Sequence, residues 1–342
     1  MVIQKIKING FRNLKNYRIS FCKNKNLIHG VNGAGKTSVL EAVFMLGFGK
    51  SFLNVKKADI VNDGSDRFLL HSEVVDTGGR VNSINALYER KFSLLLNNKK
   101  STIFDINNYL YPVIFSSSNY NLYIESKTYI RKLVDRFIFG INSLYLHYLL
   151  SYNKALKQKN YLLKTRVKVD EIRSWNKIIS EMAEKITGTK MEFIDNLNEE
   201  IDRKFNAGLR IEYVPSFPPD TDNGGTFFQR LEELMQSEIL YKRSLVGPHL
   251  DNFEMRLNRK NLKFYSSGEK KINLLMIYIG FIEFFKGMKN DYPVFLVDDF
   301  DTAIDEGNIE FLIKNCPDLQ VIATSVTKSN GFDRLIELTK EN

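Results

Sequence analysis

The stretch NLIHGVNGAGKTSVLEAVF, residues 26–44, contains residues whose types and spacing could bind a nucleotide. Gly30, Gly35, Lys36 and Thr37 fit the pattern G-x-x-x-x-G-K-[ST] without a mismatch. In that pattern the loop N–H groups surround a phosphate, the lysine reaches the β- and γ-phosphates, and the hydroxyl binds Mg²⁺. A short apolar strand, residues 27–28, precedes the loop, and an apolar-striped helix follows it. We therefore predict a site for ATP and Mg²⁺.

A second chemical element is PVFLVDDF, residues 293–300, in which four apolar residues run into Asp298 and Asp299. A run this continuous is typical of a strand that is buried on both faces of a parallel sheet. Beside a phosphate-binding loop, Asp298 would serve the Mg²⁺ ion together with Thr37. Asp299 would orient or deprotonate the attacking water. We predict Lys36, Asp298 and Asp299 as the catalytic residues.

The spacing of these elements indicates a large insertion, because 260 residues lie between Thr37 and Asp298. Just before the Asp strand, FYSSGEKKINLLMIYIGFIEFF (264–285) has Ser266, Gly268 and a polar residue opening a long apolar helix. This order resembles the ABC-type ATPases, in which the serine turn reaches a γ-phosphate held by a second copy of the protein. The same residues are also compatible with a plain helix N-cap, a capping box of Ser and Glu. The two interpretations can hold together.

Two segments after the Asp strand complete the predicted nucleotide site. The loop DTAIDEGN (301–308) is expected to cross a dimer interface with Asp305 as the contact, or else to be an ordinary solvated turn. The stretch LQVIATS (319–325) predicts a short buried strand whose Thr324 and Ser325 could face the γ-phosphate.

These elements predict an α/β fold: an ABC-type P-loop ATPase head, with a mixed or parallel sheet and helices, and an inserted, mainly helical arm lobe. We assign residues 1–115 plus 286–342 to the ATP-binding lobe and residues 116–285 to the arm lobe with the serine turn. Helical periodicity covers 144–164 and 174–205, with Ile178, Met182, Ile186 and Phe193 expected on one apolar face. Neither pattern runs long enough for an extended coiled coil.

Charge favours a polyanionic partner, since 49 Lys and Arg against 40 Asp and Glu give a formal net charge of +9. A coding bias toward Lys and Asn would produce the same excess. The arm is basic over Lys154, Lys157, Lys159, Lys164, Arg166 and Lys168, with no acid before Asp170. This stretch could be a solvated helix face or a track for the DNA backbone.

The remaining composition indicates the class and compartment of the protein. No run of about 18 apolar residues exists, so we expect no membrane span. The two cysteines, Cys22 and Cys316, have no metal-binding spacing and indicate a reducing compartment. We therefore expect a cytoplasmic protein.

In order along the chain, the motifs resemble those of the RecF family, bacterial recombination-repair ATPases of the SMC/ABC class. The matching segments are FRNL (11–14), GVNGAGKTSVLEAV (30–43), GKSFLN (49–54), YIRKLVD (129–135), YNKALKQKNYLLK (152–164), LVGPHLDNF (245–253), SSGEKK (266–271) and VDDFDTAID (297–305). The chain departs from the family pattern at Leu250, Glu269 and Ala303, where the family usually has Arg, Gln and Glu.

The resemblance implies an ATP-dependent DNA-binding protein in which ATP joins two copies into a clamp on duplex DNA near single-strand gaps. Slow hydrolysis would release the clamp. It also implies binding to single-stranded DNA and work with RecR- and RecO-type mediators. The implied nucleotide contacts are Arg12, Asn13, Gly30, Val31, Asn32, Gly33, Ala34, Gly35, Lys36, Thr37, Ser266 and Gly268. Two alternatives remain open: another SMC/ABC-type ATPase, for example in phage defence or as a transporter motor, and an ATP-gated scaffold with vestigial hydrolysis.

Overall fold

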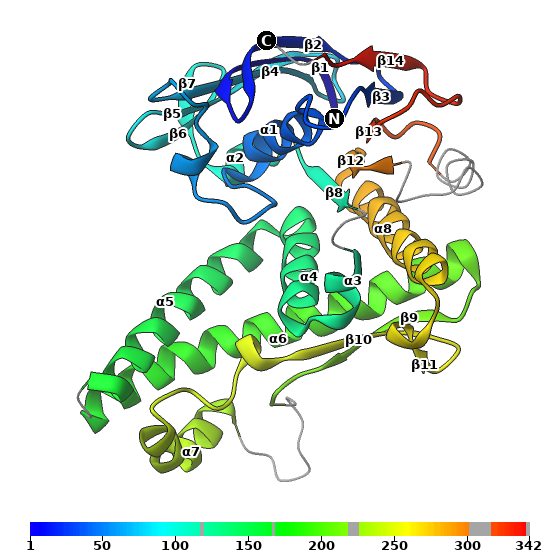
Figure 1. The fold of residues 1–342 in the computed structure, drawn as a ribbon. Helices are drawn as coiled ribbons and strands as arrows, with labels where there is room; N and C mark the ends of the chain where they lie inside the picture. The colour runs from blue at the N-terminus through cyan, green and yellow to red at the C-terminus, as the bar shows by residue number, and fades with distance from the viewer. Residues whose placement is uncertain (117–119, 166–167, 218–225, 301–315, 340–342) are drawn as a thin grey trace. The chain divides into compact units, whose positions relative to one another are not determined.

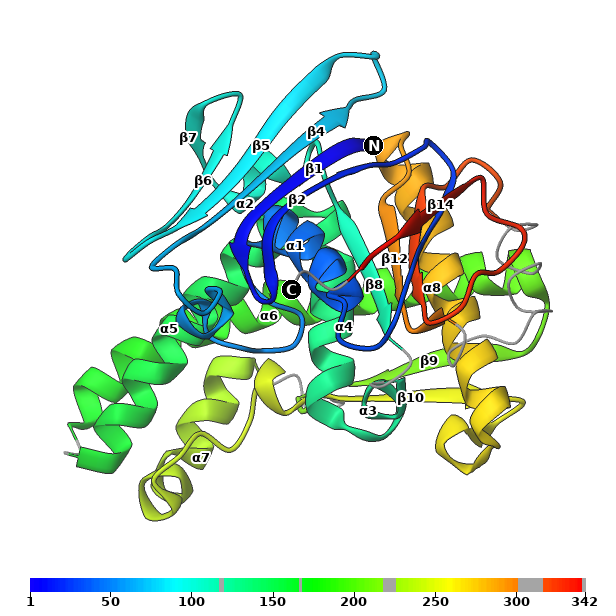
Figure 2. The same ribbon diagram turned by 45° about the horizontal axis from the view of Figure 1, so that its top comes forward.

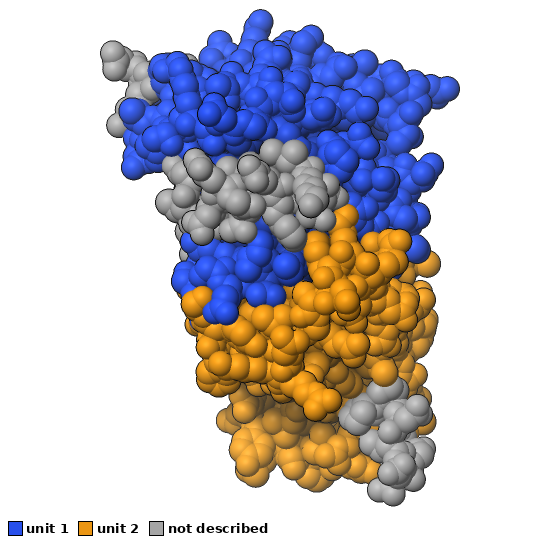
Figure 3. All heavy atoms as spheres, turned by 90° about the vertical axis from the view of Figure 1, so that its right-hand side faces the viewer, with its two compact units in different colours: residues 1–120, 267–342 blue, residues 121–266 orange. Residues whose placement is uncertain are grey.

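The structure, a computed structural model, describes residues 1–116, 120–165, 168–217, 226–300 and 316–339. Contacts within the chain define two compact units, residues 1–120 with 267–342 and residues 121–266 (Figure 3). The strands are β1 Val2–Phe11, β2 Leu14–Ser20, β3 Lys25–His29, β4 Phe68–Val75, β5 Val81–Tyr88, β6 Phe92–Leu96, β7 Lys99–Ser101, β8 Pro112–Ser116, β9 Leu209–Val214, β10 Asn252–Leu257, β11 Lys260–Asn261, β12 Val294–Asp298, β13 Val321–Ser325 and β14 Arg334–Glu337. The helices are α1 Lys36–Phe48, α2 Ile103–Ile106, α3 Tyr120–Glu125, α4 Lys127–Ile141, α5 Ser143–Thr165, α6 Val169–Phe205, α7 Phe227–Tyr241 and α8 Ser267–Lys289.

The first unit contains a five-stranded sheet in the order β14-β3-β13-β12-β8, with every neighbouring pair parallel. Strands β3, β8, β12 and β13 are buried at every residue, which explains their continuous apolar runs. Strand β13 lies between the strand before the glycine-rich loop and the strand that ends at Asp298. The buried strands predicted at 27–28, within 293–300 and within 319–325 are therefore confirmed as β3, β12 and β13.

A second sheet of the same unit is six-stranded, in the order β2-β1-β4-β5-β6-β7, and antiparallel throughout. Its strands alternate buried and less buried residues, as β4 shows, because one face packs inward and the other does not. Figure 2 shows this sheet as one curved layer over α1. Helix α1 is buried on nearly all sides, so its apolar residues do not form a single stripe.

The second unit consists mainly of α4, α5, α6 and α7, and α5 packs along α6 (Figure 1). The helices expected at 144–164 and 174–205 correspond to α5 and α6. Ile178, expected in the apolar face, is 42% exposed, and Ile179 is buried in its place. A three-stranded antiparallel sheet, β9-β10-β11, also belongs to this unit, a feature that the helical periodicity did not predict.

The compact units differ from the predicted lobes at one element. Helix α8, which we expected in the arm lobe, belongs to the first unit because its aromatic residues pack on the parallel sheet. The ring of Tyr278 contacts those of Phe115 and Phe295, and the ring of Phe285 stacks on Tyr111. Among the described helices, none is both long and apolar enough to cross a bilayer.

Candidate functional site

The glycine-rich loop runs from the end of β3 to the start of α1, as its sequence predicts. Gly30 and Gly35 have φ of 152° and 101°, backbone conformations that residues with a side chain rarely adopt. A Cβ atom on Gly30 would lie 2.2 Å from the Leu338 carbonyl oxygen, and one on Gly35 would lie 2.5 Å from Leu14 Cδ2. The two glycines are therefore required by the path of the loop.

Lys36, the first residue of α1, folds back over the loop. Its Nζ donates hydrogen bonds to the carbonyl oxygens of Gly30, at 2.6 Å, and Val31, at 3.2 Å. Lys36 is only 6% exposed, and it has no oppositely charged partner among the described residues. A buried ammonium group with only carbonyl partners favours an anionic ligand such as a phosphate.

Asp298 lies beside Thr37 although the two residues are far apart in sequence. The Thr37 hydroxyl donates a 2.9 Å hydrogen bond to Asp298 Oδ1, which also accepts a 2.9 Å hydrogen bond from the Thr324 hydroxyl. The Thr324 oxygen in turn accepts a hydrogen bond from the backbone N–H of Asp299, also at 2.9 Å. The two predicted Mg²⁺ ligands thus meet at the carboxyl edge of the parallel sheet, where such sheets bind ligands.

The donor set at this edge fits a divalent cation. Burial raises the pKa of the Asp298 carboxyl, and the neighbouring Asp299 charge raises this pKa further, against hydrogen bonds from Thr324 and Thr37. Asp298 is 3% exposed and has no cationic partner among the described residues. A cation bound by Asp298 and Thr37 would compensate this buried negative charge, and both offer the hard oxygen ligands that Mg²⁺ prefers.

Arg12 and Asn13 both contact the phosphate-binding segment, but in different ways. The Asn13 side chain donates to the Gly33 carbonyl oxygen at 3.0 Å and accepts a hydrogen bond from Ser38 at 3.0 Å. Arg12 instead forms a two-point ion pair with Glu41 of α1, at 2.8 and 2.9 Å. Asn13 therefore supports the loop directly, and Arg12 supports the helix behind it.

Sequence reasoning did not identify Glu41 as part of this support. Glu41 is 1% exposed, and besides Arg12 it accepts a hydrogen bond from the Ser51 hydroxyl. Ser51 lies in the GKSFLN segment (49–54), one of the segments that resemble the family. The sequence does contain a signal for this role. Glu41 stands among the apolar residues of the helix, and a buried carboxylate requires partners.

The serine turn lies at the beginning of α8, and its residues 266–269 are exposed. The Ser267 hydroxyl is 2.7 Å from the Tyr120 hydroxyl, and Lys271 Nζ lies over the Tyr120 ring at 5.3 Å. A Cβ atom on Gly268 would meet nothing within 4 Å, so the turn presents open backbone there. The predicted dimer contact Asp305 lies outside the described residues.

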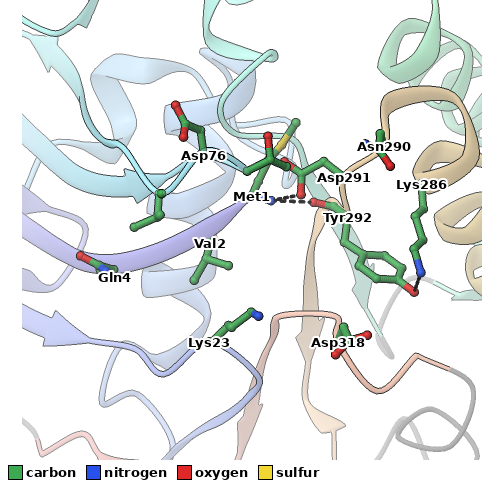
Figure 4. A pocket seen from close by; sticks show the side chains of 13 residues that line it. Met1, Val2, Gln4, Lys23, Asp76, Lys286, Asn290, Asp291, Tyr292 and Asp318 are labelled. Carbon is green, nitrogen blue, oxygen red and sulfur yellow. Dashed lines mark hydrogen bonds and ion pairs between the residues drawn. The ribbon is translucent and has the colours of Figure 1, made fainter.

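A pocket of about 430 Å³ lies at the other end of the parallel sheet, away from the carboxyl edge that holds Asp298. It is lined by residues near the beginnings of β1, β3 and β12 and the end of β4, among them Lys23, Asp76 and Tyr292 (Figure 4). None of the predicted site residues lines it. The pocket is therefore separate from the nucleotide edge.

Comparison with known proteins shows the family of this chain. The family model described as RecF/RecN/SMC N terminal domain matches residues 2–342. The DNA replication and repair protein RecF of Acetivibrio thermocellus is 31% identical over 359 residues, covering 96% of this chain and 94% of that protein. RecF of Clostridium perfringens strain SM101 is 27% identical and covers 100% and 96%.

Solved structures give the same result for the fold. The recombination mediator protein RecF with ATP, described in the RecFOR pathway, superposes with a TM-score of 0.90 at 25% identity, covering 99% of this chain and 96% of that chain. An SMC head domain from Pyrococcus furiosus gives a TM-score of 0.57 at 17% identity, covering 99% and 94%, and so shares the fold. The predicted ATPase-head fold with a helical arm is confirmed. The chain belongs to the RecF family of DNA replication and repair proteins, ATPases of the SMC/ABC class.

Proposed function

We propose that this protein binds ATP and Mg²⁺ at residues 30–37 and Asp298, and that ATP joins two copies into a clamp on duplex DNA near single-strand gaps. One observation carries the nucleotide part of this proposal. Lys36 and Asp298 are both buried at one sheet edge, and among the described residues neither has a partner of opposite charge. A phosphate and a divalent cation would compensate these two charges together.

The position of the serine turn supports a second copy as part of the site. Tyr278 of α8 packs near the carboxyl end of β8, and Phe285 packs near its beginning, so α8 runs antiparallel to β8. Ser267, at the helix start, is therefore about 16 Å beyond Tyr278 along the axis, at ~1.5 Å per residue. This places the turn past the carboxyl edge of the sheet.

The lateral separation adds to this distance. Strands β13 and β12 lie between β3 and β8, so the glycine-rich loop and the β8 side of the sheet are about 14 Å apart at ~4.8 Å per strand. A turn that projects beyond one side of the sheet would not reach a phosphate held at the other side of the same chain. Ser266 and Gly268 would instead approach the nucleotide of a partner copy, and the exposed backbone at the helix start suits an anion.

The DNA and mediator parts of the proposal come from the relatives and the charge. The curated relatives are DNA replication and repair proteins, and the solved RecF–ATP structure is described within the RecFOR pathway. With a net charge of +9, DNA is a physically matched partner. We infer gapped duplex and single-stranded DNA as ligands, RecO- and RecR-type proteins as partners, and the cytoplasm as the place of action.

The test is the solution mass of the protein with and without ATP–Mg²⁺, repeated with gapped duplex DNA. We expect a monomer that dimerises with ATP and then holds DNA in a salt-sensitive manner. Ser266→Arg should spare ATP binding and block dimerisation, because the bulky cation stands where the partner's nucleotide would lie. Ser174→Arg, on the exposed side of α6 in the second unit, is the control and should leave both ATP binding and dimerisation unchanged.

The alternatives give different results in the same measurements. A protein that stays monomeric with ATP bound would contradict the sandwich while leaving the nucleotide site intact. A dimer that forms without measurable phosphate release, with or without DNA, would indicate an ATP-gated scaffold. Dimerisation without any DNA affinity would point to another role within the SMC/ABC class.

A further inference from the structure

Helix α5 of the second unit has an exposed face that the nucleotide chemistry does not use. Lys154, Lys157, Tyr161 and Lys164 follow one another at intervals of three or four residues, which places them on one side of the helix. All four are exposed, and Tyr161 is 60% exposed. The opposite side carries the buried residues of the helix, such as Tyr152 and Leu162.

The positive charge of this face is not neutralised. No Asp or Glu occurs between Asp135 and Asp170, and none of Lys154, Lys157 and Lys164 forms an ion pair among the described residues. Lys159, which the sequence placed in the same basic track, is excluded from it. Its side chain is 0% exposed and its Nζ lies 2.7 Å from Glu238 Oε2.

The end of α7 lies beside the same helix and adds exposed residues next to it. Glu238 and the backbone N–H of Ser244 both contact α5, the latter through a 2.8 Å hydrogen bond to Asn160. Residues 240–243, between these two anchors, are exposed, with Tyr241 62% exposed and followed by Lys242 and Arg243. We name the set Lys154, Lys157, Tyr161, Lys164, Tyr241, Lys242 and Arg243 the arm face.

We propose that the arm face binds single-stranded DNA, with phosphates on its lysines and bases stacked on Tyr161 and Tyr241. The proposal rests on the proposed function in so far as the polyanion is DNA. Lysines alone would suit either form of DNA, but a duplex hides the faces of its bases within the stack. Exposed tyrosines between cationic side chains match the combination of backbone tracking and base stacking that single strands use.

The span of the face limits the length of strand that it can hold. Lys154 and Lys164 are about 15 Å apart along the helix axis, at ~1.5 Å per residue. That length accommodates a few nucleotides of an extended strand. Such a short site would hold the single-stranded part of a gapped molecule only in combination with other contacts.

The experiment measures affinity for a labelled oligo-dT strand and for a blunt duplex, without nucleotide, over a salt series on the full chain. Tyr161→Ala combined with Tyr241→Ala should weaken oligo-dT binding about tenfold or more and leave duplex binding unchanged, since each stacked base contributes on the order of 1–3 kcal/mol. Replacing Lys154, Lys157 and Lys164 with Gln should lower the salt slope for oligo-dT by about two, at ~0.7 per phosphate contact.

Two controls separate this site from general charge effects. The same three lysines changed to Arg should keep the wild-type slope, because the charge remains. Lys177→Gln on the exposed side of α6 should change the slope less than Lys157→Gln does. Fluorescence of Trp175, the single tryptophan, which packs in the α5–α6–α7 cluster, verifies that each variant is folded.

Each outcome decides between defined possibilities. Unchanged oligo-dT affinity in the Tyr and Gln variants, in a protein whose wild type binds DNA, would overturn the arm face and leave the proposed function standing. An equal loss of duplex affinity in the Tyr variant would overturn the stacking model. A wild type with no affinity for either DNA would overturn the arm face and the proposed function together.

Discussion

The nucleotide edge of the first unit and the interior of the second unit use the same residue types in opposite ways. At the edge, Lys36 contacts backbone carbonyls and Asp298 contacts hydroxyls, and neither charge is paired among the described residues. In the second unit, Lys190 and Asp251 are each 1% exposed and lie 3.0 Å apart. A buried charge that the chain leaves unpaired is available to a ligand, whereas a paired one is part of the structure.

A connected polar network lies within the interior of the second unit. Lys190 also lies 3.9 Å from Asp135, which accepts a hydrogen bond from Tyr145, and Tyr213 donates to Asp251 at 2.6 Å. Burial raises the pKa of the Asp135 carboxyl and of the Tyr145 and Tyr213 hydroxyls. Networks of this kind are costly when one member is removed, because the remaining charges stay buried.

Asp299→Asn is expected to give the largest effect, and it acts only at the nucleotide edge. If Asp299 handles the attacking water, kcat for ATP should fall by roughly 10²- to 10⁴-fold while ATP affinity is kept. The ATP-bound dimer should then accumulate. Steady-state phosphate release and solution mass measure the two effects.

Asp318→Asn, an exposed carboxylate on the rim of the pocket at the opposite sheet edge, is the matched control and should leave turnover unchanged. Wild-type turnover in Asp299→Asn would show that another group activates the water.

Lys190→Met is the corresponding change in the second unit. It leaves the buried Asp251 and the half-buried Asp135 without their cation, and we expect a loss of about 3–5 kcal/mol in the free energy of unfolding of this unit. Urea unfolding followed by Trp175 fluorescence measures it. The ATP affinity of the folded protein should not change.

Lys185→Met on the same helix is the control, because Lys185 pairs with Glu181 at 44% and 64% side-chain exposure and an exposed pair contributes about 1 kcal/mol or less. Equal losses in the two variants would mean that the buried network contributes no more than a surface ion pair.

The contrast also explains what could be predicted from the sequence. The glycine-rich loop, Thr37 and the Asp strand were predictable because a phosphate cradle is built from consecutive residues with fixed roles. Strand order, in contrast, is not encoded by any local pattern. It places β13 between β3 and β12 and thereby brings Thr324 to Asp298. The division of nucleotide contacts among the predicted residues remains a prediction.

The arm shows the limits of periodicity. Lys159 and Lys157 look equivalent in a basic run, yet Lys159 is buried because Glu238 of another helix meets it. Ile178 is exposed and its neighbour Ile179 is buried, and a broad apolar pattern does not show which of two adjacent residues faces the core. The sheet β9-β10-β11 joins segments on either side of α7, and such pairing between distant segments is invisible to a local search.

The smallest expected effect is the pH dependence of stability that His249 causes in the polar network of the second unit. Its ring Nδ1 lies 2.6 Å from the Tyr152 hydroxyl, and burial lowers the pKa of His249 to about 4. Between pH 6.5 and pH 4 the unfolded chain therefore binds a proton that the folded chain does not. The contribution of the neutral, buried His249 to the free energy of unfolding should be fully present above pH 6.5. The free energy of unfolding should then fall by about 3 kcal/mol as the pH drops to 4.

The raised pKa of Asp135 acts in the opposite direction, because the folded state then holds a proton that the unfolded state has lost. A variant comparison isolates the histidine from this opposing contribution. Urea midpoints from Trp175 fluorescence at pH 7 and pH 4.5 should differ less in His249→Gln than in the wild type, since glutamine does not titrate. If both proteins lose the same stability over this range, the buried histidine stays neutral in the unfolded chain as well or is protonated in the folded one. In either case His249 would not be the group that makes the stability of the second unit sensitive to acid.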